Sequence, residues 1–559
     1  MRRCVIRPAY LTFLSLLAAC GPEGPVDPPP PAAEQTVVLA SPVDTLISLD
    51  ETAQLTVTVT EANGTAVVNP SVNWASSAPG TVSVTAQGEI RARDSGSALI
   101  SATVGGASDT LEITVFQKAA SIQVTGLDTV FNVGVRTRFS VTAVDALGNT
   151  YTRTPLEWTT SDPGVATVES TGLVLPLAAG AAVVSVRAGD DSGAHTLAVV
   201  PDIALQVNAA LAEALQWTFE DSLTANGVIG ASAAVVIPGV GTWRGVFGRS
   251  GDTDRIRPNM MFPTGSISKM VVSSLMLDLV DDGLVGLDDT VGQWLPPFSN
   301  PNISPGISIR QLMQNTSGLH SHTSNQAFTD SVFADQQRVW TPDEIMEMFV
   351  LEPVFAPGTS WKSSGTGYVL VGMIAEAVTG ELAVDLYRNR LFNPMGLAQA
   401  TLGGFEAPPA PAAVTWNGLF GGPFENFTAT YLNGPSFDTA IWVAFGTKIS
   451  AGSLAEFGTQ LFGDFLSPAI RADMLTTVPD DGGIPGQVAG GLGVREYNYL
   501  GRRQFGHSGA QVNGGGFLVW DEDSGITIAI LYNQNGSSHQ GSHFRLVPQL
   551  LSIALTAAP

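Results

Sequence analysis

The sequence contains 559 residues and carries a formal net charge of −24, with 44% hydrophobic and 14% charged residues. A chain of this length is too long for one ordinary hydrophobic core, so we expect several folded domains. The acidic charge leaves no basic surface that would neutralise phosphates, which excludes nucleic acid as a partner.

The first residues predict export and attachment to a membrane. Residues 1–19 combine three arginines with the apolar run AYLTFLSLLAA, the layout of a secretory signal peptide. The sequence LAAC, which ends at Cys20, resembles the bacterial lipobox, in which the cysteine is lipidated and becomes the first residue of the mature protein. A chance cysteine after small residues is the alternative. Cys4 would leave with the signal, so we expect no disulfides. Residues 20–35 contain a proline run and predict a stiff tether.

The sequence repeats itself after this tether. Trp158 follows Trp74 by 84 residues, and Gly172 follows Gly88 by the same distance. Apolar residues alternate in runs such as QLTVTVT and RFSVTAV, which is the period of a strand with one buried face. We therefore predict two small β-sandwiches in tandem. Their ranges are 36–117 and 118–201.

Both copies resemble one known module. The pattern VNWASSAPGTVSVTAQGEI, echoed by LEWTTSDPGVATVESTGLV, is similar to the group 2 bacterial immunoglobulin-like domain nearly end to end. Neither copy shows a cluster of polar or aromatic residues typical of a binding surface, so we interpret both as spacers. Contact with cell-wall polymer is the alternative.

Residues 202–559 have a different pattern. The stretch ALQVNAALAEALQWTFEDSL predicts an amphipathic helix, and ASAAVVIPGVGTWRGVFG predicts a hairpin. Near the end, GGGFLVWDEDSGITIAILYN predicts a second hairpin, followed by a closing helix. Strands at both ends with helices between them indicate one sheet built from both termini, with a helical insertion.

The stretch FPTGSISKMVVSSLMLDLVDDG contains the strongest chemical signal. From Ser266 to about Val280 it lacks Gly and Pro and is apolar almost all round, and Gly283 stands where a helix would end, which predicts a buried helix. Ser266 and Lys269 lie on one face of its first turn. Burial favours the uncharged lysine amine, which can accept the serine proton, and the helix start offers N–H groups to an oxyanion. A serine followed by a solvated lysine is the alternative.

Five stretches in family order resemble the serine hydrolases that comprise class C β-lactamases, DD-peptidases and related esterases. They are FPTGSISKM, DDGLVGLDDTVGQWLP, SIRQLMQNTSGLHSH, PGTSWKSSGTGYVLVGMIAEAVTG and GHSGAQVNGGGFLVW, and the resemblance as a whole extends over about 225–555. The resemblance implies an antiparallel sheet flanked by helices, an all-helical subdomain beside it, and an acyl-enzyme intermediate. The expected fold class is thus two all-β immunoglobulin-like sandwiches followed by a β-lactamase/transpeptidase-like α+β domain.

The resemblance also implies roles for residues in the first and last motifs. Ser266 matches the nucleophile, and Lys269 matches its partner in proton transfer. His507 stands where relatives have lysine or histidine beside the substrate, and Ser508 and Gly509 follow it as substrate-binding residues. The backbone N–H of Ala510 would join that of Ser266 in an oxyanion hole. Because histidine titrates near neutral pH, we expect any help that His507 gives an anionic substrate to fade as pH rises.

The middle motif departs from the family pattern. Relatives usually read Y-S-N-x-x-Y there, whereas this chain has Ser363, Ser364 and Gly365 in the first three places. We predict that Ser363 replaces the relay tyrosine and that Ser364 and Gly365 line the substrate site. Glycine removes an amide that donates and accepts hydrogen bonds. Tyr431, in a second Y-x-N sequence, is the alternative relay.

The remaining candidates have simpler interpretations. His539 and His543 are four apart, but no carboxylate or cysteine set accompanies them, so we predict no metal and no cofactor. His320 and His322 follow NTSGL, and we interpret them as an exposed loop pair. Lys362 is interpreted as a surface residue.

Together these patterns predict a lipid-anchored serine hydrolase that acts on esters, D-amino-acid peptides or β-lactams. Its partners would be a small-molecule or peptide substrate and a membrane, with the outer membrane favoured and the domains facing periplasm or cell surface. The alternative is a non-catalytic envelope lipoprotein that keeps the fold with a degenerate middle motif.

Overall fold

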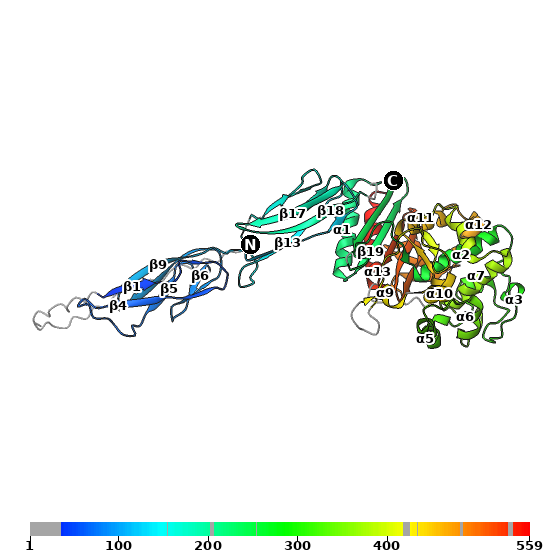
Figure 1. The fold of residues 1–559 in the computed structure, drawn as a ribbon, viewed down its shortest axis with the longest axis horizontal. Coiled ribbons are helices and arrows are strands. Elements are labelled where there is room, and N and C mark those ends of the chain that lie inside the picture. Colours follow the sequence, from blue (N-terminus) through cyan, green and yellow to red (C-terminus); the bar gives the residue numbers. More distant parts are fainter. Residues whose placement is uncertain are drawn as a thin grey trace, which may run out of the picture. The chain divides into compact units, whose positions relative to one another are not determined.

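A computed structural model describes most of the chain (Figure 1). The described residues are 35–153, 155–201, 206–252, 254–417, 425–432, 434–480, 484–534 and 540–559. The predicted signal peptide, Cys20 and most of the tether lie outside these ranges. The described residues form two compact units, of which the second consists of Gln123–Val141, Leu156–Arg187 and Ser192–Pro559. Within the described ranges, no helix is both long and apolar enough to cross a membrane.

The two copies of the repeat have the same strands in the same order. Each copy gives a four-stranded sheet, β2-β9-β8-β5 or β11-β18-β17-β14, a three-stranded sheet, β3-β7-β6 or β12-β16-β15, and one pair, β1-β4 or β10-β13. The first copy consists of β1 (Thr36–Ala40), β2 (Thr45–Leu46), β3 (Thr52–Gln54), β4 (Thr56–Thr60), β5 (Asn73–Ser76), β6 (Val82–Val84), β7 (Glu89–Ala92), β8 (Gly96–Val104) and β9 (Ala107–Val115). The second consists of β10 (Ser121–Thr125), β11 (Thr129–Val130), β12 (Thr137–Arg138), β13 (Ser140–Val144), β14 (Glu157–Thr160), β15 (Ala166–Val168), β16 (Leu173–Pro176), β17 (Gly180–Ala188) and β18 (Asp191–Val199).

One contact explains the tryptophan and glycine that recur in both copies. A Cβ on Gly88 would lie 2.5 Å from ring atom Cζ2 of Trp74, and a Cβ on Gly172 would lie 3.0 Å from the same atom of Trp158. Both glycines have positive φ angles, 79° and 83°. The ring therefore packs directly on a turn that only glycine forms without strain. The predicted all-β immunoglobulin-like fold of this region is confirmed.

An eight-stranded antiparallel sheet organises the C-terminal region, in the order β20-β19-β31-β30-β29-β28-β27-β26. β19 pairs with both β20 and β31, so strands from the two ends of this region meet in one sheet, as the sequence predicts. Its strands are β19 (Gly230–Ile237), β20 (Gly241–Gly248), β26 (Val478–Pro479), β27 (Gln487–Gly490), β28 (Arg495–Tyr499), β29 (Arg502–Gln511), β30 (Gly514–Asp521) and β31 (Thr527–Tyr532). Smaller sheets contain β21 (Phe262–Pro263), β22 (Ala400–Leu402) and β25 (Thr447–Ile449), and β23 (Trp416–Asn417) with β24 (Glu425–Asn426).

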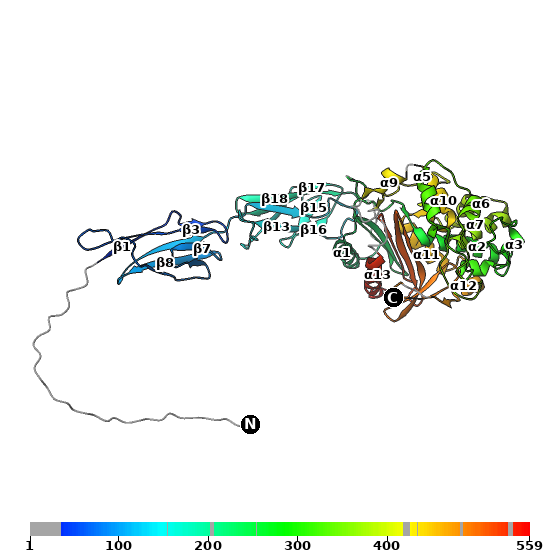
Figure 2. The same cartoon turned by 90° about the horizontal axis from the view of Figure 1, so that it is seen from below.

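Helices cover both faces of this sheet (Figures 1 and 2). α1 and α13 pack on one face, against alternate residues of β19 such as Ala233 and Val235, whereas Ala234 between them belongs to the other core, with α2, α7, α10 and α11. The helices are α1 (Ala209–Ala225), α2 (Ser268–Asp281), α3 (Val291–Trp294), α4 (Ile309–Met313), α5 (Gln326–Ala334), α6 (Pro342–Phe349), α7 (Gly365–Thr379), α8 (Ala383–Leu386), α9 (Phe427–Tyr431), α10 (Ser436–Phe445), α11 (Ala451–Phe462), α12 (Pro468–Met474) and α13 (Gln540–Leu555). Three shorter helical segments are η1 (Gly265–Ile267), η2 (His322–Ser324) and η3 (Tyr387–Phe392).

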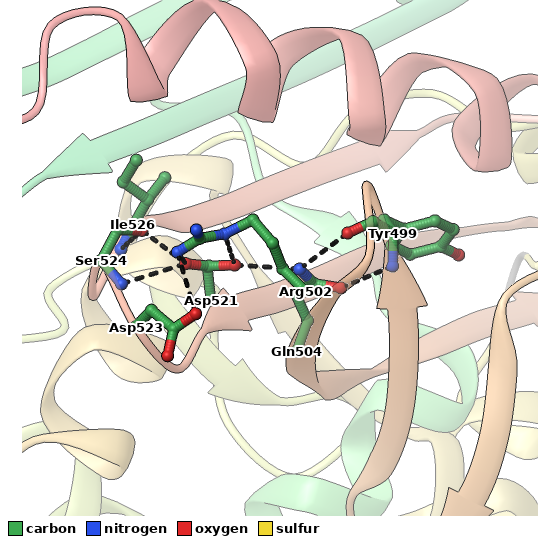
Figure 3. Close-up of polar contacts among 7 residues, drawn as sticks. All are labelled: Tyr499, Arg502, Gln504, Asp521, Asp523, Ser524 and Ile526. Carbon is green, nitrogen blue, oxygen red and sulfur yellow. Dashed lines mark hydrogen bonds and ion pairs between the residues drawn. The ribbon is translucent and has the colours of Figure 1, made fainter.

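A polar network fixes the ends of the central strands (Figure 3). The carboxylate of Asp521 accepts hydrogen bonds from Arg502 at 2.9 Å, from Gln504 at 2.9 Å and from the Ser524 hydroxyl at 2.7 Å. Burial alone would raise the pKa of Asp521, but these hydrogen bonds outweigh it and lower the pKa to about 2. The ionised network therefore holds β29 and β30 in register at neutral pH.

The contact between Gly88 and Trp74 predicts an asymmetry between two glycines of the first copy. Gly64 has a φ of 85°, similar to that of Gly88, but a Cβ there would meet no atom within 4 Å. Gly64→Ala therefore introduces only backbone strain, whereas Gly88→Ala also forces the Trp74 ring to move. We expect Gly88→Ala to destabilise the copy by about 1–3 kcal/mol more than Gly64→Ala. Hydrogen exchange of β5 and β7 in the full chain measures this difference, and equal effects of the two substitutions would contradict it.

Candidate active site

The chain reaches the predicted nucleophile through a turn that only glycine fits. Ser266 lies in η1, directly before α2. Gly265 has a φ of 56°, and a Cβ there would lie 2.8 Å from the backbone nitrogen of Ala510 in β29. A Cβ on Gly509 would in turn overlap the carbonyl oxygen of Thr264. Two glycines thus allow the GHSG strand to lie against the start of the nucleophile helix.

Buried hydroxyl groups hold this turn in place. The hydroxyl of Thr264 lies 2.9 Å from that of Ser268 and donates a hydrogen bond to the carbonyl oxygen of Thr447 at 2.9 Å. The backbone N–H of Thr447 donates to the Ser268 hydroxyl at 3.1 Å. Both ends of η1 are therefore tied to β25, which limits the positions that Ser266 can adopt.

The predicted nucleophile and base are in direct contact. Nζ of Lys269 donates a hydrogen bond to Oγ of Ser266 at 2.7 Å. Lys269 is only 1% exposed, and its amine lies 3.9 Å from the centre of the Phe445 ring and 5.7 Å from that of Tyr368. Burial, with a further contribution from the charge of Arg495, lowers the pKa of Lys269 well below its usual value. The site therefore favours an uncharged amine at proton-transfer distance from a serine hydroxyl.

The oxyanion hole implied by the resemblance is compatible with this geometry. Ser266 lies at the N-terminal end of the helical segment that α2 continues, and β29 brings the backbone nitrogen of Ala510 beside the preceding residue. Ser508, in the same strand, is half-buried. N–H groups of a helix start and of an adjacent strand can both point at a developing oxyanion.

Asn315 organises the middle motif. Its side-chain oxygen accepts a hydrogen bond from the backbone N–H of Ser364 at 3.1 Å. Its backbone carbonyl oxygen accepts one from the backbone N–H of Lys362 at 2.9 Å. Ser364 precedes the first residue of α7, and Ser363 is half-buried just before it. Among the described residues, no hydrogen bond links the Ser363 hydroxyl to Ser266 or Lys269. The relay role of Ser363 thus stays a prediction.

The glycine in place of the family's asparagine has a steric reason. A Cβ on Gly365 would lie 2.6 Å from Cε2 of Phe445 and 3.2 Å from Cε1 of His322. The space that a side chain would occupy is filled by these two rings. Phe445 follows Trp442, whose φ of 37° and ψ of −137° interrupt α10. Such a conformation costs a non-glycine residue on the order of 1–3 kcal/mol and is often retained at functional sites.

His322 is not the exposed loop residue that the sequence suggested. It is 0% exposed, and its ring lies 5.0 Å from that of Phe328 and 6.3 Å from that of Phe445. Burial is the main reason why the pKa of His322 is lowered to about 3, so the ring is neutral. The rings that cover His322 come from α5, which packs back onto the loop, and from α10, so its burial depends on how these two helices pack.

His507 is also buried, and this corrects its expected pH dependence. The side chain is 1% exposed, and its Nδ1 interacts with the Ser508 carbonyl oxygen at 2.5 Å. Burial, with a further contribution from the charge of Arg495, lowers the pKa of His507 well below its usual value. The ring is therefore neutral at neutral pH, and it cannot supply a positive charge that fades as pH rises.

Arg495 is a buried cation that sequence reasoning missed. It begins β28, pairs with Gly506 in β29, and lies with its guanidinium 5.7 Å from the centre of the Trp361 ring. Its Nη1 donates a hydrogen bond to Gln487, while its Nε is buried without a partner among the described residues. The alternation of REYNY, with the arginine on the side of the two tyrosines, was a signal for its burial.

The other candidates lie apart from these groups or outside the description. Lys362 is exposed and His320 is half-buried, with its Nδ1 3.1 Å from the Ser321 carbonyl oxygen. The Tyr431 and His543 side chains and all of His539 lie outside the described parts of the chain. Within those parts, no group of three or more His, Cys, Asp or Glu residues is arranged to hold a metal ion.

Comparisons with known proteins identify two families along the chain. Residues 215–550 match the Beta-lactamase family model, and residues 36–115 match the bacterial Ig-like domain (group 2) model. Penicillin-binding protein 4* of Bacillus subtilis is 26% identical over 40% of this chain and 50% of its own length. A D-aminopeptidase of Cereibacter sphaeroides is 25% identical over 54% of this chain and 56% of its own length. The chain thus spans about half the length of these two relatives.

A solved structure supports the same fold. The D-stereospecific amidohydrolase from Streptomyces sp. has a TM-score of 0.53 and 27% sequence identity, and the match covers 62% of this chain and 99% of that one. The predicted fold class of the C-terminal region is therefore confirmed.

Burial of Lys269 predicts opposite effects of one substitution on activity and stability. Lys269→Met removes the base and should abolish acylation of Ser266. The unfolded chain binds a proton at this lysine below about pH 10, whereas the folded state disfavours it, so the wild type loses stability as pH falls from that value. We expect the variant to gain on the order of 1 kcal/mol or more at pH 7 and less at pH 9, since each pKa unit is worth about 1.4 kcal/mol.

Denaturant unfolding at the two pH values measures this gain, and Lys448→Met, at the lysine that pairs with Asp438 at 2.5 Å, is the control. A loss of stability in Lys269→Met at pH 7 would contradict the proposed uncharged amine.

Proposed function

Because the chain belongs to the beta-lactamase family, we propose that it is a serine hydrolase that works through an acyl-enzyme on Ser266. The observation that carries this proposal is the 2.7 Å contact between Ser266 and the buried amine of Lys269. A lysine on a solvated surface would keep its amine charged and exposed. A fold that is retained for binding alone gains nothing from burying a lysine amine.

The reaction would proceed in two steps. Oγ of Ser266 attacks the substrate carbonyl carbon as its proton moves to Nζ of Lys269. The carbonyl oxygen then accepts hydrogen bonds from the backbone N–H groups of Ser266 and Ala510. The proton then passes to the leaving amine or alcohol as the scissile bond breaks. Water attacks the resulting ester, which releases the acid and restores Ser266. Ser363 is the proposed proton relay between Lys269 and the leaving group.

Arg495 favours substrates with a carboxylate near the leaving group. A guanidinium is always charged in proteins, whereas burial lowers the pKa values of Lys269 and His507. In the described residues no carboxylate forms an ion pair with it. A substrate carboxylate would satisfy its unpartnered Nε with a charge-assisted hydrogen bond. D-amino-acid peptides have such a group. The names of two similar proteins, a D-aminopeptidase and a D-stereospecific amidohydrolase, also suggest D-amino-acid chemistry. Esters and β-lactams remain alternative substrates.

The location of the enzyme follows from the sequence of its first residues. We propose that it is exported and attached to a bacterial membrane through lipidated Cys20, with the outer membrane favoured and the hydrolase in the periplasm or on the cell surface. The immunoglobulin-like copies would act as spacers. A non-catalytic envelope protein is the alternative, which the altered middle motif favours.

Acylation of Ser266 tests the proposed function directly. We expect intact-mass spectrometry of the full chain to show one acyl adduct with p-nitrophenyl esters, a D-alanyl-D-alanine peptide or a fluorescent penicillin, and no adduct in Ser266→Ala. Ser363→Ala should lower turnover about 10- to 1,000-fold if it relays the proton, whereas Tyr431→Phe should have little effect. The absence of any adduct or turnover with all three substrate classes would support the non-catalytic alternative.

Removal of the Arg495 charge should change both selectivity and pH dependence. Arg495→Met should lower kcat/KM for a peptide with a free carboxylate, relative to the same peptide capped as an amide, by roughly 10- to 100-fold. Because the charge of Arg495 lowers the pKa of Lys269, its loss should raise that pKa and move the acidic limb of the kcat/KM profile to higher pH. An unchanged ratio of the two peptides would exclude the carboxylate contact.

A further inference from the structure

An apolar cavity of about 220 Å³ lies beside the catalytic groups. Helix α5 contributes Phe328, Val332 and Phe333 to its wall, and α10 contributes Phe437 and Phe445. The rings of Phe333 and Phe437 are stacked, with their centres 5.8 Å apart. An apolar protein cavity of about 150 Å³ is large enough to bind benzene, so this cavity can hold a phenyl group.

The cavity reaches the catalytic groups from two sides. Ala510, the predicted oxyanion donor, and the next residue, Gln511, form part of its wall. Phe445, on another side, contacts the amine of Lys269 and fills the space at Gly365. A carbonyl group held at Ser266 and Ala510 would have its α-carbon one bond away. Substituents on that α-carbon would therefore lie near Ala510, which forms part of the cavity wall.

Gln511 adds a polar feature to this apolar wall. Its side-chain oxygen is buried and has no hydrogen-bond partner among the described residues. A buried acceptor without a partner costs free energy that a ligand donor can recover. The α-nitrogen of an amino-acid substrate carries such a donor, and Gln511 is adjacent to the residue that would bind the carbonyl oxygen.

We propose that this cavity is the specificity pocket for the acyl part of the substrate. It takes the aromatic or large aliphatic side chain of an α-amino or α-acylamino acyl group, while Gln511 accepts a hydrogen bond from the α-nitrogen. The inference rests on the proposed function and names the substrate class of the same site. It concerns the acyl side of the scissile bond, whereas Arg495 concerns the leaving group.

Substrate pairs that differ only in the side chain test this pocket. With the full chain, we expect kcat/KM for D-phenylalanine p-nitroanilide to exceed that for D-alanine p-nitroanilide by at least about tenfold. Thr329→Trp, at a half-buried position in the cavity wall on α5, should lower this ratio about tenfold or more because the new ring fills the pocket. Ala327→Trp, at an exposed position of α5 outside the wall, is the matched control and should leave the ratio unchanged.

A second variant tests the role of Gln511. Gln511→Leu should lower kcat/KM for D-phenylalanine p-nitrophenyl ester about tenfold relative to the 3-phenylpropionate ester, which lacks the nitrogen. The proposed pocket is wrong if the wild type has equal kcat/KM values for the two anilides, or if Thr329→Trp leaves the ratio of these values unchanged. Acylation of Ser266 by p-nitrophenyl acetate separates the outcomes. If acetate acylates Ser266 and the selectivity is absent, the pocket fails; if no ester acylates Ser266, the proposed function fails.

Discussion

The structure of the site depends on burying the amine of Lys269 without a carboxylate partner. A solvated or ion-paired lysine holds its proton and cannot accept one from serine at neutral pH. Here the amine lies between Ser266 and the rings of Phe445 and Tyr368, and none of the ion pairs among the described residues includes it. Helix α2 meets this requirement because it is buried on all sides, with the other helices of the large core packed around it. Such a cost in stability is typical of groups that a protein keeps for reactivity.

Phe445 connects this requirement to the altered middle motif. The same ring covers the amine of Lys269, excludes a side chain at Gly365 and forms part of the apolar cavity. An asparagine at this place would overlap the ring, because even a Cβ would lie 2.6 Å from Cε2 of Phe445. Gly365 therefore fits its own surroundings, in which an aromatic ring fills the space of a side chain.

The sequence allowed the framework to be predicted but not the surroundings of the candidate catalytic pair, Ser266 and Lys269. The alternation of β19, the apolar length of α2 and the repeat at 84 residues are local or periodic signals, and each reflects a backbone geometry. The burial of His322 depends instead on how α5 packs back onto it and on a ring from α10, and Arg495 lies near the Trp361 ring, more than a hundred residues before it. No local pattern encodes such contacts, so the site's electrostatics required the fold.

Those surroundings also determine how the site can recognise charge. With the pKa values of Lys269 and His507 lowered by burial, neither group provides a positive charge that persists through the neutral range. An arginine guanidinium is always charged in proteins. Recognition of an anion through Arg495 would therefore be independent of pH, while proton transfer at Lys269 would set the acidic limit of activity. Because two different residues would perform these tasks, Lys269 could lose its proton without weakening the contact between Arg495 and the substrate.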